Sequence, residues 1–441
     1  NRINSLIRKN FCEEDFVVTD ELRTFVSKGS LVDMIDFSRV YFSKEIKTTF
    51  TSKLSFFDEE KYELKSLGAL AVFLQRGKNP KYDDNGYQVI KSGQARGGVE
   101  FDFSKTYYAS NYDEDDKRIL CKGDILINST GVGTAGRVTF FNLEGKYVVD
   151  NHITILRTSA YVYNLYVFYA LAYGVGFKNI EALASGTSGQ IELSVSAIEN
   201  IKIPLPPMDV QKKIVEECEK IDKAVAEDNE QIRNIEVTIS KMMLEVEGDA
   251  QKIQKLCSAI NPSKSDVNSL EKSMLVSFVE MSSVSNDGYI EQTVDKPLAD
   301  VRKSSYTYFA EGDIIIAKIT PCMENGKCAL ATGLKNGIGF GSSEFHVFRA
   351  NAKLINNVYL FAYLNRKEIR SKAAEVMTGS SGHRRVPISF YEDLEIPVPS
   401  MDKQMLIAEK YKGLMKDIES LKQQIANASS RKQAILDKYL K

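Results

Sequence analysis

Three glycines in the stretch GVGTAG, Gly131, Gly133 and Gly136, have the G-x-G-x-x-G spacing of a phosphate-binding turn and follow an apolar run typical of a strand. A dinucleotide site needs a helix directly after these glycines, because the N-terminus of that helix binds the pyrophosphate. The residues that follow, RVTFFNLEGKYVV, alternate like a second strand instead. The pattern therefore favours a glycine-rich hairpin or a substrate-facing loop over a nucleotide site.

The other reactive side chains do not have the spacing of a catalytic or metal-binding site. The acids and the lysine of DDNGYQVIK, from Asp83 to Lys91, are wrongly spaced for two-metal nuclease chemistry. The three histidines suggest no Ser/His/Asp set, and the sequence lacks the Asn/Asp-Pro-Pro-aromatic motif of an amine methyltransferase. Its six cysteines include no C-x-x-C pair, which favours unreactive thiols in a reducing, cytoplasmic setting. We predict a chain that is not itself an enzyme and holds no metal.

Polar and basic side chains gather on glycine-containing loops that recur at matched places in the two halves of the sequence. Cations suit DNA phosphates, whereas amides and guanidinium groups suit base edges. An ordinary solvated turn stays the alternative for any single residue, and the net charge of −1 gives no general attraction to nucleic acid. The residues that we predict to bind DNA are Lys91, Gln94, Arg96, Ser129, Thr130, Arg137, His152, Thr187, Ser188, Gln190, Lys318, Lys327, Ser343, Glu344, His346, Ser381, His383, Arg384 and Arg385.

The sequence contains one strand-to-helix junction twice. IENIKIPLPPMDVQKKI matches YEDLEIPVPSMDKQMLI, which places Met208 and Met401 193 residues apart. Upstream, KGDILINSTGVGTAGRV from Lys122 matches EGDIIIAKITPCMENGKC from Glu311 with a slightly different offset, as loop insertions between two copies of one fold would produce. The repeating unit is a mostly β segment, an exit marked by prolines, and a helix.

Downstream of each junction, apolar residues recur at alternating spacings of four and three, the heptad pattern of helices that pack as a coiled coil. The pattern predicts two helices of about 35–40 residues, each roughly 55 Å long at 1.5 Å per residue. The predicted seam residues are Ile214, Ile221, Val225, Ile232, Ile235 and Ile239 in the first copy and Ile407, Leu414, Ile418, Leu421, Ile425 and Ile435 in the second.

The fold class that these patterns indicate is α+β. Stretches such as RVTFFNLEGKYVVD and DIIIAK have the composition of strands, and helical patches appear at 163–174 and 355–377. At 441 residues the chain is long enough for two to four domains. No apolar run approaches the ~18 residues that a membrane-spanning helix needs.

The order of β-rich segment and long helix, used twice, resembles the specificity subunit of type I restriction–modification systems. The resemblance covers about residues 62–441 and depends on IPLPPMDVQKKI and IPVPSMDKQMLI, on GDILINSTGVGTAGRV and GDIIIAKITPCMENGKCAL, and on the G-[ST]-S-G turns before each exit. It implies two target recognition domains, each reading half of a split DNA sequence. It also implies that the two helices pair antiparallel as a spacer, related by a pseudo-twofold axis.

The resemblance further implies partners: two modification subunits that use S-adenosylmethionine to methylate adenine, and restriction subunits that use ATP and Mg²⁺. None of these cofactors is expected in this chain. The domains implied are recognition domains at 62–206 and 249–399, with spacer helices at 207–248 and 400–441. Residues 1–61 are either an N-terminal extension or the tail of a preceding domain.

Two other hypotheses stay open at this point. The long preface and the first residue, Asn1, are also compatible with the specificity part of a fused methyltransferase or restriction polypeptide. A coiled-coil scaffold that binds no DNA would fit the neutral net charge and would leave the paired polar loops unexplained.

Overall fold

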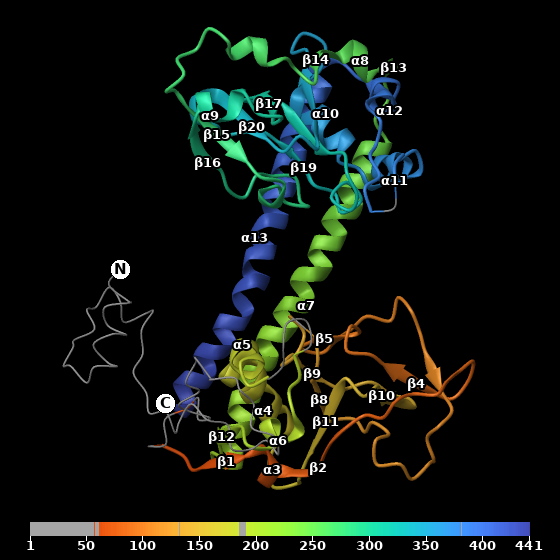
Figure 1. Ribbon diagram of the computed structural model, residues 1–441, viewed down its shortest axis with the longest axis vertical. Helices are drawn as coiled ribbons and strands as arrows, with labels where there is room; N and C mark the ends of the chain where they lie inside the picture. Colours follow the sequence, from red (N-terminus) through yellow and green to blue (C-terminus); the bar gives the residue numbers. More distant parts are fainter. Residues whose placement is uncertain (1–56, 58–60, 132, 185–190, 381) are drawn as a thin grey trace, which may run out of the picture. The chain divides into compact units, whose positions relative to one another are not determined.

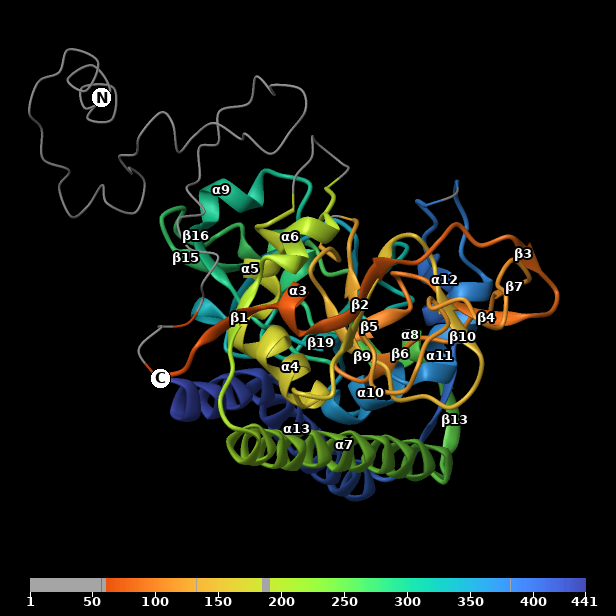
Figure 2. The same ribbon diagram turned by 90° about the horizontal axis from the view of Figure 1, so that it is seen from below.

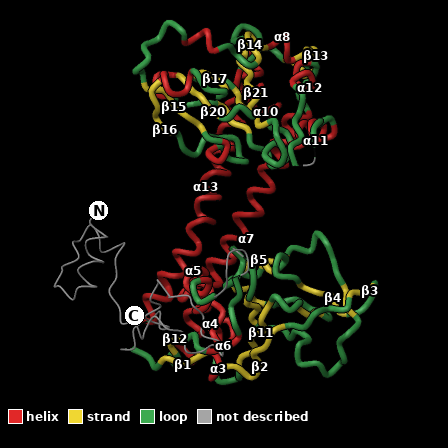
Figure 3. The backbone as a smooth tube through the Cα atoms, in the orientation of Figure 1, coloured by secondary structure: helices red, strands yellow, loops and turns green. Residues whose placement is uncertain are grey.

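The computed structural model describes residues 57, 61–131, 133–184, 191–380 and 382–441 (Figure 1). It divides the chain into two units: unit 1 runs to Asp222 and includes Ala428–Lys441, and unit 2 is Lys223–Asn427. Each unit therefore contains a piece of both long helices, α7 (Met208–Leu244) and α13 (Met401–Leu440). This division differs in kind from the boundaries expected at 61, 206, 248 and 399, which stay predictions. Helices and strands are present in both units, as the α+β class requires (Figure 3).

An antiparallel four-stranded sheet is the central layer of unit 1. Its order is β2 (Ala71–Arg76), β11 (Ile153–Thr158), β8 (Ile125–Asn128) and β9 (Val138–Phe140). Successive side chains of β8 point to opposite faces, so Ile125 and Ile127 pack in one cluster and Leu126 in another. Because both faces of β8 are buried, this strand appears in the sequence as a continuous apolar run and not as an alternating one.

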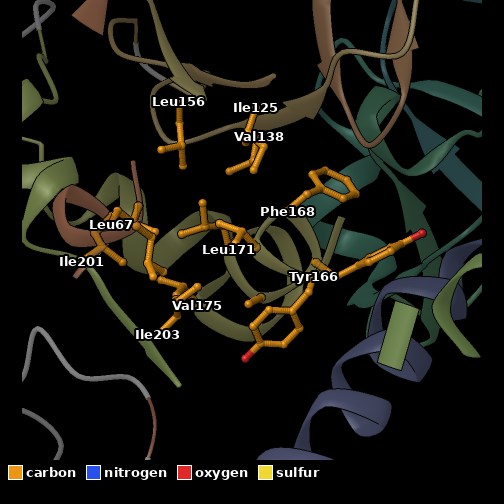
Figure 4. Close-up of a cluster of buried hydrophobic side chains, with 14 of the residues drawn as sticks. Leu67, Ile125, Val138, Leu156, Tyr166, Phe168, Leu171, Val175, Ile201 and Ile203 are labelled. Carbon is orange, nitrogen blue, oxygen red and sulfur yellow. The ribbon is translucent and has the colours of Figure 1, made fainter. Parts of the chain in front are cut away.

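Helices cover one face of this sheet (Figure 4). Figure 4 shows Leu156, Ile125 and Val138 of the sheet directed toward Phe168 and Leu171, which belong to α4 (Asn164–Tyr169) and to the π-helical turn η2 (Ala170–Gly176). The strand pair β1 (Leu64–Ser66) and β12 (Lys202–Pro204) and the short helices α3 (Leu67–Leu70), α5 (Phe177–Glu181) and α6 (Val195–Glu199) complete this side.

A second sheet packs on the other face of the central sheet of unit 1, where it contributes side chains to the hydrophobic cluster that contains Leu126. Its order is β10 (Tyr147–Val149), β4 (Tyr87–Ile90), β7 (Tyr108–Ala109) and β3 (Tyr82–Asp83), with β10 and β4 parallel. A small ribbon of β5 (Ala95–Gly97) and β6 (Glu100–Phe101) lies next to β9.

Unit 2 repeats this plan. Its antiparallel sheet has the order β14 (Cys257–Ile260), β21 (Phe345–Ala350), β18 (Ile314–Ala317) and β19 (Cys328–Leu330). The second sheet has the order β16 (Val294–Pro297), β15 (Leu275–Val279), β20 (Ile338–Gly341) and β17 (Thr307–Ala310), and β15 and β20 are parallel. The other elements are β13 (Asp249–Lys252), β22 (Glu395–Val398), α8 (Ile253–Leu256), η3 (Lys264–Val267), η4 (Met281–Ser283), α9 (Leu298–Arg302), η5 (Lys335–Gly337), α10 (Asn357–Leu364), α11 (Lys367–Glu375) and α12 (Ile388–Glu392).

The duplicated junction has the same structure in both copies. β12 and β22 end at or just after the first proline of the motif, and α7 and α13 begin at Met208 and Met401. A glutamine in the first turn of each helix closes the junction: Gln211 accepts from the backbone N–H of Tyr163 (2.8 Å), and Gln404 accepts from that of Asn356 (2.8 Å). The predicted strand-to-helix exits are therefore confirmed.

The helices have 37 and 40 residues, within the length expected from the heptads. Figures 1 and 2 show the last turns of α13 beside the first turns of α7, where Lys438 bonds Glu217 (2.9 Å). Because late residues of α13 meet early residues of α7, the pairing is antiparallel in unit 1. All twelve predicted seam residues are buried or half-buried.

Candidate nucleic-acid interface

In unit 1 the predicted polar loops meet at one end of the central sheet, where β8 ends and where β9 and β11 begin. Asn128 Nδ2 at the end of β8 donates to the carbonyl of Ser92 (2.9 Å). The next backbone N–H, of Ser129, donates to the carbonyl of His152 (2.8 Å). These contacts bring the loops 91–98, 128–137 and 150–152 together at the sheet end.

The segment that follows residue 190 joins the same end of the sheet. Leu193 N donates to the carbonyl of Ser129 (2.8 Å), and Thr130 forms an isolated β-bridge with Glu192. The hairpin between β8 and β9 packs closely against α5, since a Cβ on Gly136 (φ +90°) would lie 2.7 Å from the backbone nitrogen of Glu181. A strand follows the glycines of GVGTAG, which confirms the predicted hairpin.

Unit 2 brings three loops together at the equivalent end of its sheet. Lys318, just after β18, donates its backbone N–H to the carbonyl of Glu344 (2.9 Å) and accepts from the N–H of Val386 (2.9 Å). Two residues further, Thr320 N donates to the carbonyl of Arg384 (3.0 Å). The loops 318–327, 342–346 and 378–386 therefore form one surface, as their counterparts do in unit 1.

A buried ion pair holds the opposite end of each sheet. Arg157 forms two hydrogen bonds of 2.8 Å with Asp124, and Arg349 forms two of 2.9 Å with Asp313. The two carboxylates are 1% and 2% exposed. These hydrogen bonds raise the pKa of both arginines, so both guanidinium groups stay charged at any physiological pH. The ion pair fixes the register of β8 on β11 and of β18 on β21.

Several predicted DNA contacts of unit 1 lie at the surface of the loop cluster. His152 is exposed and its Nδ1 lies 2.8 Å from Thr130 Oγ1. Arg96 is exposed and pairs with Asp102 (2.6 Å), and Lys91 is half-buried with its Nζ 4.0 Å from the ring centroid of Tyr107.

Other predicted contacts of unit 1 hold the loops together from inside. Gln94 is 8% exposed and binds the backbone of Lys91, Asp102 and Lys105. Ser129 is fully buried, with its hydroxyl 2.6 Å from that of Thr154. The polar groups of both side chains therefore form hydrogen bonds within the fold. Thr187, Ser188 and Gln190 lie outside the described residues.

In unit 2 the exposed candidates cluster on the turn after Thr378. His383, Arg384 and Arg385 are exposed, and Arg385 forms a two-point ion pair with Glu344 (2.8 and 2.9 Å). This pairing lowers the pKa of Glu344. Ser343 is exposed too, and the side chain of Lys318 is half-buried and makes no hydrogen bond within the described part of the chain. Ser381 lies outside that part.

His346 does not reach the surface. It is 6% exposed, and its Nε2 lies 2.9 Å from the carbonyl of Val386. Burial lowers the pKa of His346, which keeps the ring neutral and makes Nε2–H the donor. This histidine therefore supports the turn that carries Arg384 and Arg385.

Two predicted cations occupy equivalent positions and do equivalent work. Arg137 and Lys327 are each the last residue of a hairpin loop, directly before the second strand of the hairpin. Arg137 donates to the carbonyl of Ala95 (3.4 Å), and Lys327 donates to the carbonyl of Val284 (2.6 Å). Both side chains are half-buried and anchor a neighbouring loop to the sheet end.

The family of the chain follows from this duplicated plan and from the match of a family model. The model described as the type I restriction modification DNA specificity domain matches twice, at residues 59–237 and 251–428. The chain belongs to this family. Each match begins near the first strand of one copy of the repeat and ends within one of the long helices.

The chain is also similar to individual members of the specificity family. It is 32% identical over 274 residues to the type I restriction enzyme EcoAI specificity subunit of Escherichia coli and 31% identical over 274 residues to the EcoEI specificity subunit of the same organism. Each match covers 58% of this chain and 45% of the relative, so the chain spans less than half the length of these relatives. A crystal structure of the specificity subunit from M. genitalium is similar with 14% identity and a TM-score of 0.47, covering 87% of this chain and 97% of that one.

Sequence reasoning missed surface residues of this family member that the tertiary structure places beside the loops. Tyr82 is 51% exposed, and together with Tyr107 it flanks Lys91, whose Nζ lies 4.9 Å from the Tyr82 ring centroid. Arg76 pairs with Glu192 (2.6 Å) across 116 residues of sequence. Only the tyrosine-rich composition could have suggested the first group, and no local signal marks the second.

The described residues include no group of three or more His, Cys, Asp or Glu side chains that could hold a metal ion. Within that same part of the chain, no helix has the length and apolarity needed to cross a membrane.

Proposed function

We propose that this chain is the DNA-reading specificity subunit of a type I restriction–modification complex and that it recognises a bipartite duplex target. Unit 1 would read one half of the target and unit 2 the other. One observation carries the proposal: the specificity-domain model matches twice, and both units gather their polar loops at the same end of the same sheet. A scaffold that binds no DNA has no need of two such loop clusters.

The arginines of the loops could bind DNA by exchanging their present carboxylate partners for groups of the DNA. Arg96, Arg384 and Arg385 each pair with an acid of the same unit, at 2.6, 3.5 and 2.8 Å. A phosphate or a guanine edge can replace each carboxylate, because guanidinium groups bind either in a two-point geometry. These internal acids also lower the general attraction to DNA and leave sequence-dependent contacts to decide affinity.

We extend the proposal to α7 and α13 as the spacer between the two half-sites. Helices of 37 and 40 residues are about 55–60 Å long at 1.5 Å per residue, roughly the length of 16 base pairs. Two modification subunits with S-adenosylmethionine would dock on the chain in the cytoplasm, and restriction subunits would add ATP- and Mg²⁺-dependent chemistry. This chain would contribute recognition and no catalysis.

The decisive experiment is methylome sequencing of a host that expresses this chain with its methyltransferase partner. We expect a split motif with methylated adenines in both halves. A single uninterrupted motif, or no methylation, would contradict the proposal. In a binding assay with the purified chain, the logarithm of the affinity for duplex DNA should fall linearly with the logarithm of salt concentration, whereas a scaffold would bind no DNA at any salt concentration.

The spacer is tested separately by helix length. Inserting four residues after Asn229 should lengthen the preferred gap between half-sites and leave their bases unchanged, while Asp228→Leu should change neither. An insertion that altered the bases read and kept the gap would show that the helices do not set the spacing.

A further inference from the structure

Lys432 of α13 is a lysine at a seam position of the heptad pattern, and its side chain is 5% exposed. It forms an ion pair with Asp222 of α7 and a 3.0 Å hydrogen bond with the hydroxyl of Tyr173. The hydroxyl of Tyr169 donates to the other carboxylate oxygen of Asp222. These four residues, all in unit 1, form a closed polar cluster inside an otherwise apolar seam.

The charge of this cluster persists at neutral pH. Burial alone would lower the pKa of Lys432, but the contacts with Tyr173 and Asp222 outweigh it and raise the pKa. Removing the carboxylate partner of a buried ammonium strongly lowers the stability of the fold, because no water replaces the missing partner. The cluster is therefore stable only when Lys432 and Asp222 meet.

The equivalent positions of unit 2 carry a different pair. With the repeat offset of 193 residues, Asp222 corresponds to Met415, Lys432 to Ile239 and Tyr169 to Ala362. Ile239, Met415 and Ala362 line one hollow of about 140 Å³ in unit 2. Arg366, the counterpart of Tyr173, lines the same hollow. The same place in the duplicated design therefore holds an ion pair between the two helices in one unit and two apolar helix residues, Ile239 and Met415, in the other.

This difference matters because α7 and α13 share one heptad register. The α7 helices of two chains have seams that fit each other, and so do the α13 helices. In an α7–α7 pair, however, Asp222 would face Ile239 of the second copy. In an α13–α13 pair, Lys432 would face Met415. Each homotypic pair leaves two half-buried or buried charges without partners, whereas the pairing within one chain leaves none.

We propose that Asp222 and Lys432, together with Met415 and Ile239, are a pairing code that selects α13 as the partner of α7 and disfavours homotypic pairing with a second copy of this chain. A single buried polar position is a known means of fixing partner and register in coiled coils. The inference concerns assembly of the chain and does not depend on DNA recognition.

The code can be tested by exchanging its members in the full chain. In the variant Ile239→Lys with Lys432→Ile, both contacts within one chain are mismatched, whereas both homotypic contacts become matched. After refolding over a range of protein concentrations, we expect a dimer fraction at least tenfold above that of the natural chain, measured by mass photometry. The melting temperature of the monomer should fall by about 10 °C.

A compensated variant separates the code from simple damage. Adding Asp222→Met and Met415→Asp to the exchange restores matched contacts within one chain, and we expect the dimer fraction and the melting temperature to return close to natural values. The matched control Val225→Ile with Ile418→Val exchanges two equivalent apolar seam residues and should leave both measurements unchanged.

Two results would overturn the proposal. One is an exchange variant that stays monomeric with the natural melting temperature. The other is a compensated variant that is as dimeric, or as insoluble, as the exchange variant. The reciprocal exchange, Asp222→Met with Met415→Asp, must give the same dimer shift as the first exchange, and its failure to do so counts equally against the code.

Discussion

Tyr166 in unit 1 and Tyr359 in unit 2 are fully buried, and each donates a 2.6 Å hydrogen bond to the carbonyl of the proline in its exit strand. The second sheets of the two units differ around their pair of parallel strands. In unit 1 another strand lies beside β4 while β10 is at the edge of the sheet, whereas in unit 2 further strands lie beside both β15 and β20. The duplicated chain has kept the side chains that fix each exit strand and sheet and has changed the elements around the loops. The proposed recognition of two different DNA half-sites would require this combination.

The ion pair at the end of each central sheet should be the part of the shared framework whose mutation lowers stability most. Arg157→Met removes the charged partner of the buried carboxylate of Asp124, which keeps only the hydrogen bond from the backbone N–H of Cys121, and should lower the free energy of unfolding of unit 1 by about 3 kcal/mol. Arg349→Met should do the same in unit 2. Hydrogen exchange in urea, followed by mass spectrometry of peptides from each unit, measures both effects.

A surface pair gives the matched control for this prediction. Lys122→Met breaks the exposed contact with Glu144 (2.7 Å) and should change the stability by less than about 0.5 kcal/mol. If only one of the two arginines, Arg157 or Arg349, proved important, the units would not share one framework.

The tyrosine hydrogen bond should be the next most important feature. Tyr166→Phe and Tyr359→Phe each remove one hydroxyl and leave a buried carbonyl without its donor, at a cost of about 1–2 kcal/mol in the unit concerned. Equal losses in the two units would support equivalent roles at the two junctions. The same hydrogen-exchange measurement checks this expectation, with Tyr161→Phe, an exposed tyrosine, as the control.

Loop anchoring should affect DNA binding one half-site at a time. Arg137→Met frees the loop at Ala95, and Lys327→Met frees the loop at Val284, so each should weaken binding to the half-site of its own unit by about fivefold. Competition assays with each half-site randomised in turn would measure this. A variant that weakened both half-sites equally would argue for a general charge effect instead.

The smallest expected difference is in pH dependence. Burial lowers the pKa of His346 below its usual value near 6.5, so the unfolded chain binds more protons than the folded one as the pH falls below that value. Unit 2 should therefore lose stability through this residue below about pH 6.5. Unit 1, with Thr154 at the matching position, should not. His346→Thr should flatten the pH profile of unit 2 between pH 5 and 7, measured by urea unfolding.

The sequence by itself determined the features that depend on local pattern. Heptad spacing determined the two helices and the apolar seam of each, because the register of apolar residues on a helix is fixed by its own period. The antiparallel pairing was an expectation from the family resemblance. The prolines before Met208 and Met401 set the exits, and the glycines of GVGTAG followed by an alternating stretch set a hairpin. The recurrence of the exits and of the heptads at an offset of 193 residues determined the duplication.

Only the tertiary structure decided what each polar side chain does. Gln94 and His346 were expected at the surface and are buried, because their partners come from loops that the sheet brings together. Lys432 looks like an interruption of the seam until Asp222, 210 residues away, supplies its carboxylate. A local sequence carries no record of such distant partners. The role of a charge depends on which opposite charge the fold places beside it and on whether water reaches both.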